Sequence, residues 1–388
     1  MKSKSCLFLF GLMASVAIGI YTASAAQPPT YVIQDLGIVP GMTDVVPTHI
    51  NSSGDVVGIA SAGEEKCAAG YKASQKGMED IGGLGSRAFA LNDVGIVVGD
   101  STFEGPGAGA VAASHAAFFK GGRAFDMGTL EGALYSRAND INAAQQIVGF
   151  SSTTLDGPYS RAFVWTGQGG MSDLGTLGGA FAQANAINDN GFVTGWSQTA
   201  TANLMAQTHA FLYQLKKPGS PIPPMRDLGT LGGFNSYGTC VNASNHVVGY
   251  SDINGNNNIF HAFLYNGEKM IDLGSLAGNT PKGDYSAALG INSSDQVVGY
   301  TFVPIHPAAE HPVQVKQVAF IWGNLGQINK MIDLNTLTGR PGARYYLFSA
   351  VAISDNGQIA ASAYVAGDSS VHTVLLTPIK TQYPPPAP

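Results

Sequence analysis

The residues best suited to metal chemistry lie in a short polar stretch near the middle of the chain. Asp252, Asn254 and Asn256 place side-chain oxygens at alternate positions, as a calcium-binding loop does. The stretch then departs from the calcium pattern, because Asn257 stands where the sharp turn needs Gly and Phe263 stands where a bidentate Glu is expected. We therefore interpret the stretch as a polar turn and keep calcium as the alternative.

A second group of possible metal ligands lies in the segment IHPAAEH. It contains His306, Glu310 and His311, but the nearby prolines and the loop-like composition do not favour a metal site. We also find no Gly-x-Ser-x-Gly elbow, no phosphate-binding loop and no His-Glu-x-x-His pattern. From these patterns we predict neither a catalytic residue nor a bound cofactor.

The composition indicates an all-β protein. The chain has 388 residues and 50 glycines, and only 12% of its residues are charged. Glycine weakens helices and is favoured in turns, so this composition is unusual for a helical enzyme. The formal net charge of -6 leaves no basic stripe that could follow a phosphate backbone, and we exclude nucleic acid as a partner.

The two ends of the chain differ in composition from the rest. Lys2 and Lys4 precede an apolar run and a small-residue end, so residues 1–26 are expected to be a cleaved secretory signal peptide. No other apolar run is long enough to cross a bilayer, and the mature protein is expected in the periplasm or outside the cell. After cleavage only Cys67 and Cys240 remain, so no disulfide framework is expected. Residues 380–388 form a Pro-rich tail.

Three short signatures recur along the chain and divide it into seven repeats. The first, Asp-Leu-Gly or a close variant, begins at Asp35, Asp80, Asp126, Asp173, Asp227, Asp272 and Asp333. The second, of the form Ile-Asn-x-x-Gly-x-Val-Val-Gly, begins at Ile50, Leu91, Ile141, Ile187, Val241, Ile291 and Ile353. The third, His-Ala-Phe, begins at His115, Arg161, His209, His261, Val318 and His372, with a degraded copy near Tyr71.

Each repeat contains four short apolar stretches, which is the content of one propeller blade. We name the strands a to d; in the fourth repeat they are 183–188, 192–196, 209–213 and 225–228. Strand a is rich in Ala, Gly and Ser, which suits the crowded centre of a ring, and Asn51, Asn188 and Asn292 are expected to bond the backbone of the a–b turn.

The chain begins with a lone d strand at 32–36 and finishes with a c strand, and these pieces are complementary. We therefore predict that residues 27–379 form a seven-bladed β-propeller of four-stranded blades, closed by the N-terminal strand completing the last blade. Val32, Ile33 and Leu36 are expected to be buried in that strand.

The phrases HAFLYNG, MSDLGTLGG and INDNGFVTGWS together resemble the HAF repeat, named for His-Ala-Phe, of probable extracellular bacterial proteins. The resemblance covers nearly the whole mature chain and implies an exported bacterial protein. It implies no activity that could be assigned to individual residues.

The alternation of strand direction separates two faces of the predicted ring. The a–b and c–d turns share one, the turn face; the b–c and d–a loops share the other, the loop face. The longer and more variable connections are expected on the loop face: 101–114, 151–160, 197–208, 251–260 and 301–317. The candidate ligand-contacting residues are His49, Arg87, Arg137, Asp252, His306 and His311.

The repeated His and Asp residues favour a structural network over catalysis. His209 and Asp227 lie on adjacent antiparallel strands and could meet, and equivalent pairs recur in other blades. We expect an exported binding or scaffold protein that recognises a glycan, a surface polymer or another protein through the loop face. The alternative is an extracellular or periplasmic carbohydrate-active enzyme, a lyase or hydrolase, with its site at the propeller mouth. The Ala, Gly and Ser content of the inner strands favours binding.

Overall fold

The computed structural model describes most of the chain between residues 29 and 379. Inside that span it leaves out 63–68, 75–76, 105–111, 154–159, 168, 201–206, 217–220, 222, 254–255, 278–283, 306–313, 325–328 and 340–343. The predicted signal peptide and the Pro-rich tail lie outside the described residues. Within the described ranges no helix is long and apolar enough to span a membrane.

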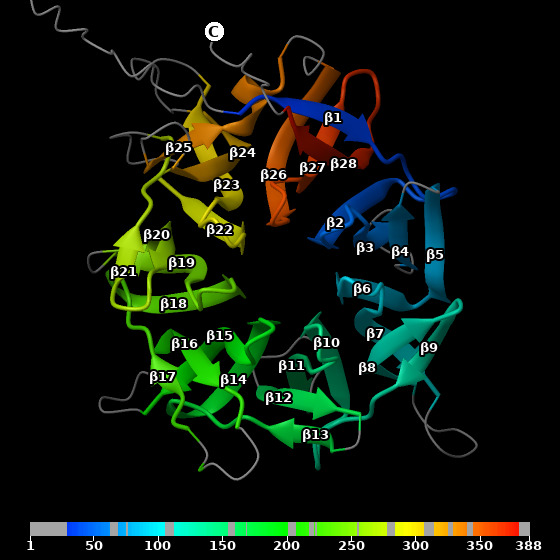
Figure 1. Cartoon of the computed structure of the whole chain (residues 1–388), viewed down its shortest axis with the longest axis vertical. Coiled ribbons are helices and arrows are strands. Elements are labelled where there is room, and N and C mark those ends of the chain that lie inside the picture. The colour runs from blue at the N-terminus through cyan, green and yellow to red at the C-terminus, as the bar shows by residue number, and fades with distance from the viewer. Residues whose placement is uncertain are drawn as a thin grey trace, which may run out of the picture.

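The described strands form five four-stranded antiparallel sheets and one eight-stranded sheet, in which a parallel bridge from Asp44 to Val371 joins two four-stranded units. These seven units are arranged as blades around a central axis (Figure 1). Blades 1 to 3 are β2 (Asp44–Ile50), β3 (Val56–Ser61), β4 (Ala69–Ser74), β5 (Gly77–Leu84); β6 (Ser86–Leu91), β7 (Val97–Phe103), β8 (Ala113–Lys120), β9 (Arg123–Asp126); and β10 (Tyr135–Ile141), β11 (Ile147–Ser152), β12 (Ser160–Thr166), β13 (Gly170–Asp173).

Blades 4 to 6 are β14 (Gly178–Ile187), β15 (Phe192–Thr199), β16 (Thr208–Gln214), β17 (Arg226–Asp227); β18 (Gly232–Val241), β19 (Val247–Ile253), β20 (Asn256–Tyr265), β21 (Met270–Asp272); and β22 (Ser286–Ile291), β23 (Val297–Pro304), β24 (Val315–Asn324), β25 (Asn329–Asp333). Blade 7 is β26 (Tyr345–Ile353), β27 (Ile359–Val365), β28 (Val371–Pro378) and β1 (Tyr31–Asp35). A short 3-10 helix, Leu334–Leu337, precedes it. The predicted seven-bladed propeller is therefore confirmed.

The innermost strand of every blade is the predicted strand a, and neighbouring inner strands contact one another around the axis (Figure 1). Each inner strand carries a β-bulge close to its end, for example between Ala184 and Ala186 in β14. The bulge bends the strand where seven strands converge. In the fourth blade β14 begins earlier than predicted, and β17 is shorter.

A glycine of strand b explains why Phe recurs in the His-Ala-Phe signature. Gly249 of β19 pairs with Phe263 of β20 across the ladder. A Cβ at Gly249 would lie 1.9 Å from the carbonyl oxygen of Tyr237 and 3.0 Å from the Phe263 ring. The phenyl ring therefore occupies the space that the missing side chain leaves, and Phe263 is fully buried.

The hydrophobic core is divided into clusters that lie between neighbouring blades. One cluster joins Val148 and Ala162 of blade 3 to Ala184, Val193 and Phe211 of blade 4. A blade has two faces, and both are covered in this way, so small and β-branched residues fill the strands. Stability is thus distributed around the ring.

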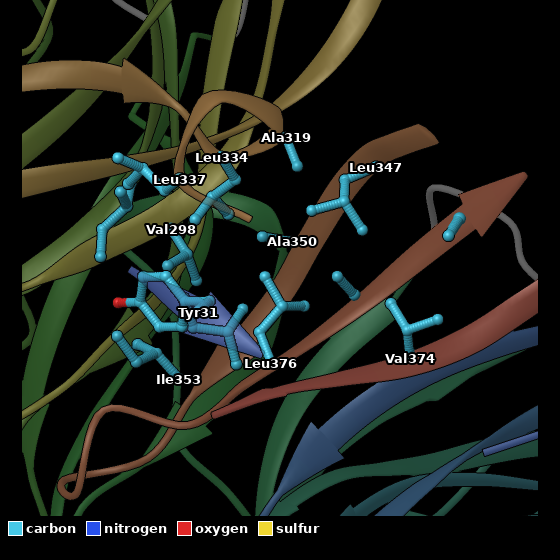
Figure 2. Packing of buried hydrophobic residues seen from close by; sticks show 14 residues of the cluster. Tyr31, Val298, Ala319, Leu334, Leu337, Leu347, Ala350, Ile353, Val374 and Leu376 are labelled. Atoms are coloured by element: carbon cyan, nitrogen blue, oxygen red, sulfur yellow. The ribbon is translucent and has the colours of Figure 1, made fainter. Parts of the chain in front are cut away.

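The N-terminal strand closes the ring as predicted. β1 pairs antiparallel with β28 in a register that joins Tyr31 to Pro378 and Asp35 to Val374. Figure 2 shows Tyr31 among buried residues of blades 6 and 7, including Val298 and Leu376.

The prediction that Val32 is buried was wrong, because its side chain is 56% exposed. Side chains alternate along a strand, so Tyr31 and Ile33 point into the core and Val32 points to solvent. Leu36 follows the strand and packs against two small clusters as expected.

Candidate functional site

The His-Ala-Phe and Asp-Leu-Gly signatures meet within each blade, as the sequence predicted. His209 Nδ1 lies 2.8 Å from Asp227 Oδ2, and the N–H of Gly229 donates to Asp227 Oδ1 at 2.8 Å. In blade 3 Arg161 replaces the His and pairs with Asp173 at 2.8 Å. A guanidinium substitutes for an imidazole here, so the shared role is to hold strands c and d together.

One member of this set, His261, contacts two carboxylates. Its Nδ1 lies 2.9 Å from Asp272 and its Nε2 lies 3.2 Å from Asp284. Burial works against the charged imidazole, but hydrogen bonding and the charges of both carboxylates raise the pKa of His261 above its ordinary value. Asp284 also accepts a hydrogen bond from Ser275 Oγ. This extended network lies at the loop-face end of blades 5 and 6.

The Asn of the second signature links each blade to the next on the turn face. Asn188 Oδ1 accepts hydrogen bonds from the N–H groups of Asn190 and Phe192, as predicted for the a–b turn. Asn188 Nδ2 donates to the carbonyl oxygen of Asn242 in blade 5 at 2.7 Å.

The same inter-blade bond is made from Nδ2 of Asn51, Asn92, Asn142, Asn242 and Asn292 to the equivalent carbonyl of the following blade. In blade 7 Ser354 stands in place of the Asn, and Asn356 Nδ2 closes the circle by donating to the Ser52 carbonyl at 3.1 Å. The sequence predicted the bonds within the turns but not this ring of bonds between blades.

The channel end next to this ring is narrow and contains three titratable side chains at one repeat position. A cavity of about 330 Å³ there is lined by residues of all seven inner strands, including His49, Asp140 and Cys240. His49 was predicted on the ligand-contacting loop face, and the structure corrects this. It is the next-to-last residue of β2, so it lies at the turn-face end.

Burial controls the ionisation of these three groups. It lowers the pKa of His49 to about 4, raises that of Asp140 to about 7 and raises that of Cys240 to about 11. Asp140 accepts hydrogen bonds from the N–H groups of Ile141 and Ile187, the second of which belongs to blade 4. Asp140 therefore acts as an inter-blade contact, and Cys240 is a free but unreactive thiol.

The opposite end of the channel, on the loop face, contains the predicted Arg87 and Arg137. Both guanidiniums contact the buried carboxylate of Asp100; Arg87 binds it in a bidentate manner. Arg137 also lies over the rings of Phe89 and Phe150, at 4.7 and 5.2 Å. The structure thus brings these two predicted residues together, in blades 2 and 3.

A row of aromatic side chains continues around the loop face into blades 4, 5 and 6. Ring centroids of successive neighbours are 4.9 to 6.3 Å apart. The row consists of Trp196, Tyr237, Tyr250, Phe260, Tyr285, Phe302 and Tyr300. All seven side chains are half-buried. We call the part from Tyr237 to Tyr300, which belongs to blades 5 and 6, the aromatic cluster.

Asp252, which the sequence suggested as a ligand-contacting residue, lies beside the aromatic cluster. Its Oδ2 accepts hydrogen bonds from the backbone and side-chain amides of Asn235, at 3.0 and 2.9 Å. The predicted loop 251–260 is largely strand, because β19 extends to Ile253 and β20 begins at Asn256. Strand pairing continues past the repeat signature here, which brings Phe260 and Tyr250 into contact.

Most of the residues considered as metal ligands lie where the structure gives no description of their side chains. Asn254, the side chain of Asn256, His306 and His311 lie outside the described residues. Among the residues that are described, no group of three His, Cys, Asp or Glu side chains could hold a metal ion.

A separate hollow of about 520 Å³ lies on the turn face, against blades 1 to 3. Its walls include Phe118, Phe119 and Trp165, with Lys72 and Glu79 among the charged residues. The hollow was not predictable from the sequence, because residues of three blades form it and no single repeat contains it.

Comparison with known proteins gives little functional information. Residues 83–222 match the model of a family described as a protein of unknown function, DUF3466. A search of curated proteins finds no match. One similar solved structure is a β-fructofuranosidase of glycoside hydrolase family 32 from Bombyx mori, a mutant in complex with sucrose. It is 8% identical, covers 91% of each chain and superposes with a TM-score of 0.34.

Proposed function

We propose that this propeller is a binding or scaffold protein that recognises a glycan, a surface polymer or another protein through its loop face. The observation that supports the proposal best is the row of seven half-buried aromatic rings on that face. Aromatic side chains supply large contact areas at binding surfaces, and a rigid repeat scaffold holds them in place.

The difference between the two faces supports the same choice. On the turn face the Asn ring uses the turn amides for contacts between blades. The loop face carries the row of aromatic rings and the Arg87–Asp100–Arg137 cluster. The loop face therefore offers more side chains of the types that bind ligands.

The proposal includes export from a bacterial cell. It is supported by the apolar N-terminal run between Lys4 and the small residues Ala23 to Ala25, and by the resemblance of the repeats to HAF repeat proteins.

Blocking one face at a time tests the proposal. In a Cys67→Ala background, Phe234→Cys places a thiol on the loop face and Val94→Cys places one on the turn face. Both side chains are apolar and exposed, at 45% and 73%. Each variant is coupled to a bulky polyethylene-glycol maleimide and screened against neutral and acidic polysaccharides, peptidoglycan, lipopolysaccharide and a protein array, with product analysis for every ligand found.

We expect ligand binding by the uncoupled protein and by the coupled Val94→Cys variant, and loss of binding by the coupled Phe234→Cys variant. The reverse dependence, or no binding to any member of the panel, would overturn the proposal. Cleaved saccharide products would instead support the alternative of a carbohydrate-active enzyme.

A further inference from the structure

We infer that the aromatic cluster binds a neutral saccharide chain, with sugar rings resting on the tyrosine and phenylalanine faces and sugar hydroxyls bonded to Tyr250, Tyr300 and Asp252. This inference rests on the proposed function and assigns its ligand class. Its rings come from β18, β19 and β20 of blade 5, from Tyr285 just before β22, and from β23 of blade 6. These two blades are adjacent in Figure 1.

Successive rings of the aromatic cluster contact one another, and their planes are tilted at different angles. Tyr237 and Tyr250 are stacked at 4.9 Å with an interplanar angle of 23°. Phe260 follows at 5.4 Å with a tilt of 56°, and Tyr285 lies a further 5.2 Å away. Ring faces carry partial negative charge and attract the polarised C–H bonds of a sugar ring. Half-buried rings that follow one another in space can each contact one unit of a saccharide chain.

The polar side-chain atoms of the aromatic cluster and of Asp252 can form hydrogen bonds with sugar hydroxyl groups. Among the described residues, the phenol groups of Tyr250 and Tyr300 make no hydrogen bond. Burial, together with Tyr237, Tyr300 and Asp252 nearby, raises the pKa of Tyr250 to about 12, so its hydroxyl remains a neutral donor. Asp252 uses Oδ2 for Asn235, and its Oδ1 has no partner in the described part of the chain. A half-buried donor and a buried acceptor without partners favour a ligand that supplies both.

The charged side chains near the aromatic cluster favour a neutral glycan over an acidic one. Among the described residues, no Lys or Arg lies over a ring of the aromatic cluster. The carboxylate of Asp252 lies near Tyr250 and would repel a uronic acid.

Affinity electrophoresis tests this inference directly. Protein comprising residues 27–388 is run through gels that contain glycogen, dextran, laminarin, galactomannan or xyloglucan, with alginate as the acidic comparison. The variants are Tyr250→Ala, Tyr250→Phe, Tyr300→Phe and Phe125→Ala. Phe125 is the matched control, because it is an exposed aromatic residue on the other side of the molecule, stacked on Phe118.

We expect at least one neutral polysaccharide to retard the protein. Loss of a whole ring in Tyr250→Ala should weaken binding about 10-fold or more, and loss of one hydroxyl in Tyr250→Phe or Tyr300→Phe should weaken it about 3- to 10-fold. Phe125→Ala should bind as the parent does. The two Phe variants keep the ring, so they remain informative even where Tyr250→Ala does not fold.

A second readout locates the ligand. With Trp165→Phe and Trp322→Phe, the remaining fluorophore is Trp196, whose ring lies 6.3 Å from Tyr237. We expect the bound polysaccharide to change its emission. No retardation by a neutral polysaccharide, equal binding by all variants, or an unchanged emission would overturn the inference.

The two proposals fail differently. A ligand that is blocked from the loop face by the Phe234 adduct, yet is alginate or a protein and ignores the tyrosine variants, would overturn the saccharide assignment and leave the proposed function standing. A ligand blocked by the Val94 adduct would overturn the proposed function itself.

Discussion

Asp140 is the residue at which protonation and folding are most directly linked. Burial raises its pKa to about 7, while an unfolded Asp titrates near 3.9, so the folded state holds this proton more tightly. The contribution of the Asp140 carboxyl to the free energy of unfolding is therefore greatest below about pH 4 and falls as pH rises to about 7. Three pKa units correspond to about 4 kcal/mol.

We expect Asp140→Ala to flatten the pH dependence of the free energy of unfolding between pH 4 and pH 7. Ala occupies the equivalent position in blades 2, 4 and 7, as Ala90, Ala186 and Ala352, so the fold accommodates it. Urea unfolding at several pH values measures the effect. Parallel pH profiles for the two proteins would show that the Asp140 carboxyl is not held protonated.

Among the elements, β1 is the one on which closure of the ring depends. It provides the outer strand of blade 7, buries Tyr31 and pairs Asp35 with His372 at 3.0 Å. Deleting residues 27–37 should therefore lower the free energy of unfolding by about 3 kcal/mol or more, although the segment is terminal. Circular dichroism melts compare the two proteins. An unchanged cooperative melt would contradict a closing role for β1.

Two neighbouring residues of β1 provide a matched test. Tyr31 is 3% exposed and Val32 is 56% exposed, so only the first fills the core between blades 6 and 7. Tyr31→Ala should cost about 3 to 5 kcal/mol, and Val32→Ala should stay within about 0.5 kcal/mol of the parent. Equal effects in urea unfolding would mean that β1 docks in another register.

For the whole molecule, the prediction concerns its location. Cells that produce the full-length protein should contain a form beginning at Ala26 or Gln27 outside the cytoplasm, because Ala23-Ser24-Ala25 is suited to signal cleavage. Fractionation followed by N-terminal sequencing measures this. Finding uncleaved protein confined to the cytoplasm would contradict the export proposal.

The sequence by itself determined the number and kind of repeats. Seven copies of the turn, strand and loop signatures are local patterns, and the split repeat at the two ends of the chain required a ring. The meeting of His209 with Asp227 was also predictable, because both lie on paired strands of one blade. Interactions within a repeat can be read from the spacing of its residues.

The tertiary structure decided what happens between repeats. The Asn188–Asn242 bond, the Arg87–Asp100–Arg137 cluster and the row from Trp196 to Tyr300 all cross blade boundaries. Asn188 belongs to a repeated signature, but the spacing of that signature does not show its partner in the next blade. The Arg and aromatic residues stand at positions that vary from blade to blade, so no periodic pattern marks them. They become neighbours only when the twisted blades pack around the axis. Side-chain proximity across a blade interface depends on the pitch and closure of the ring, which spacing along the chain does not encode.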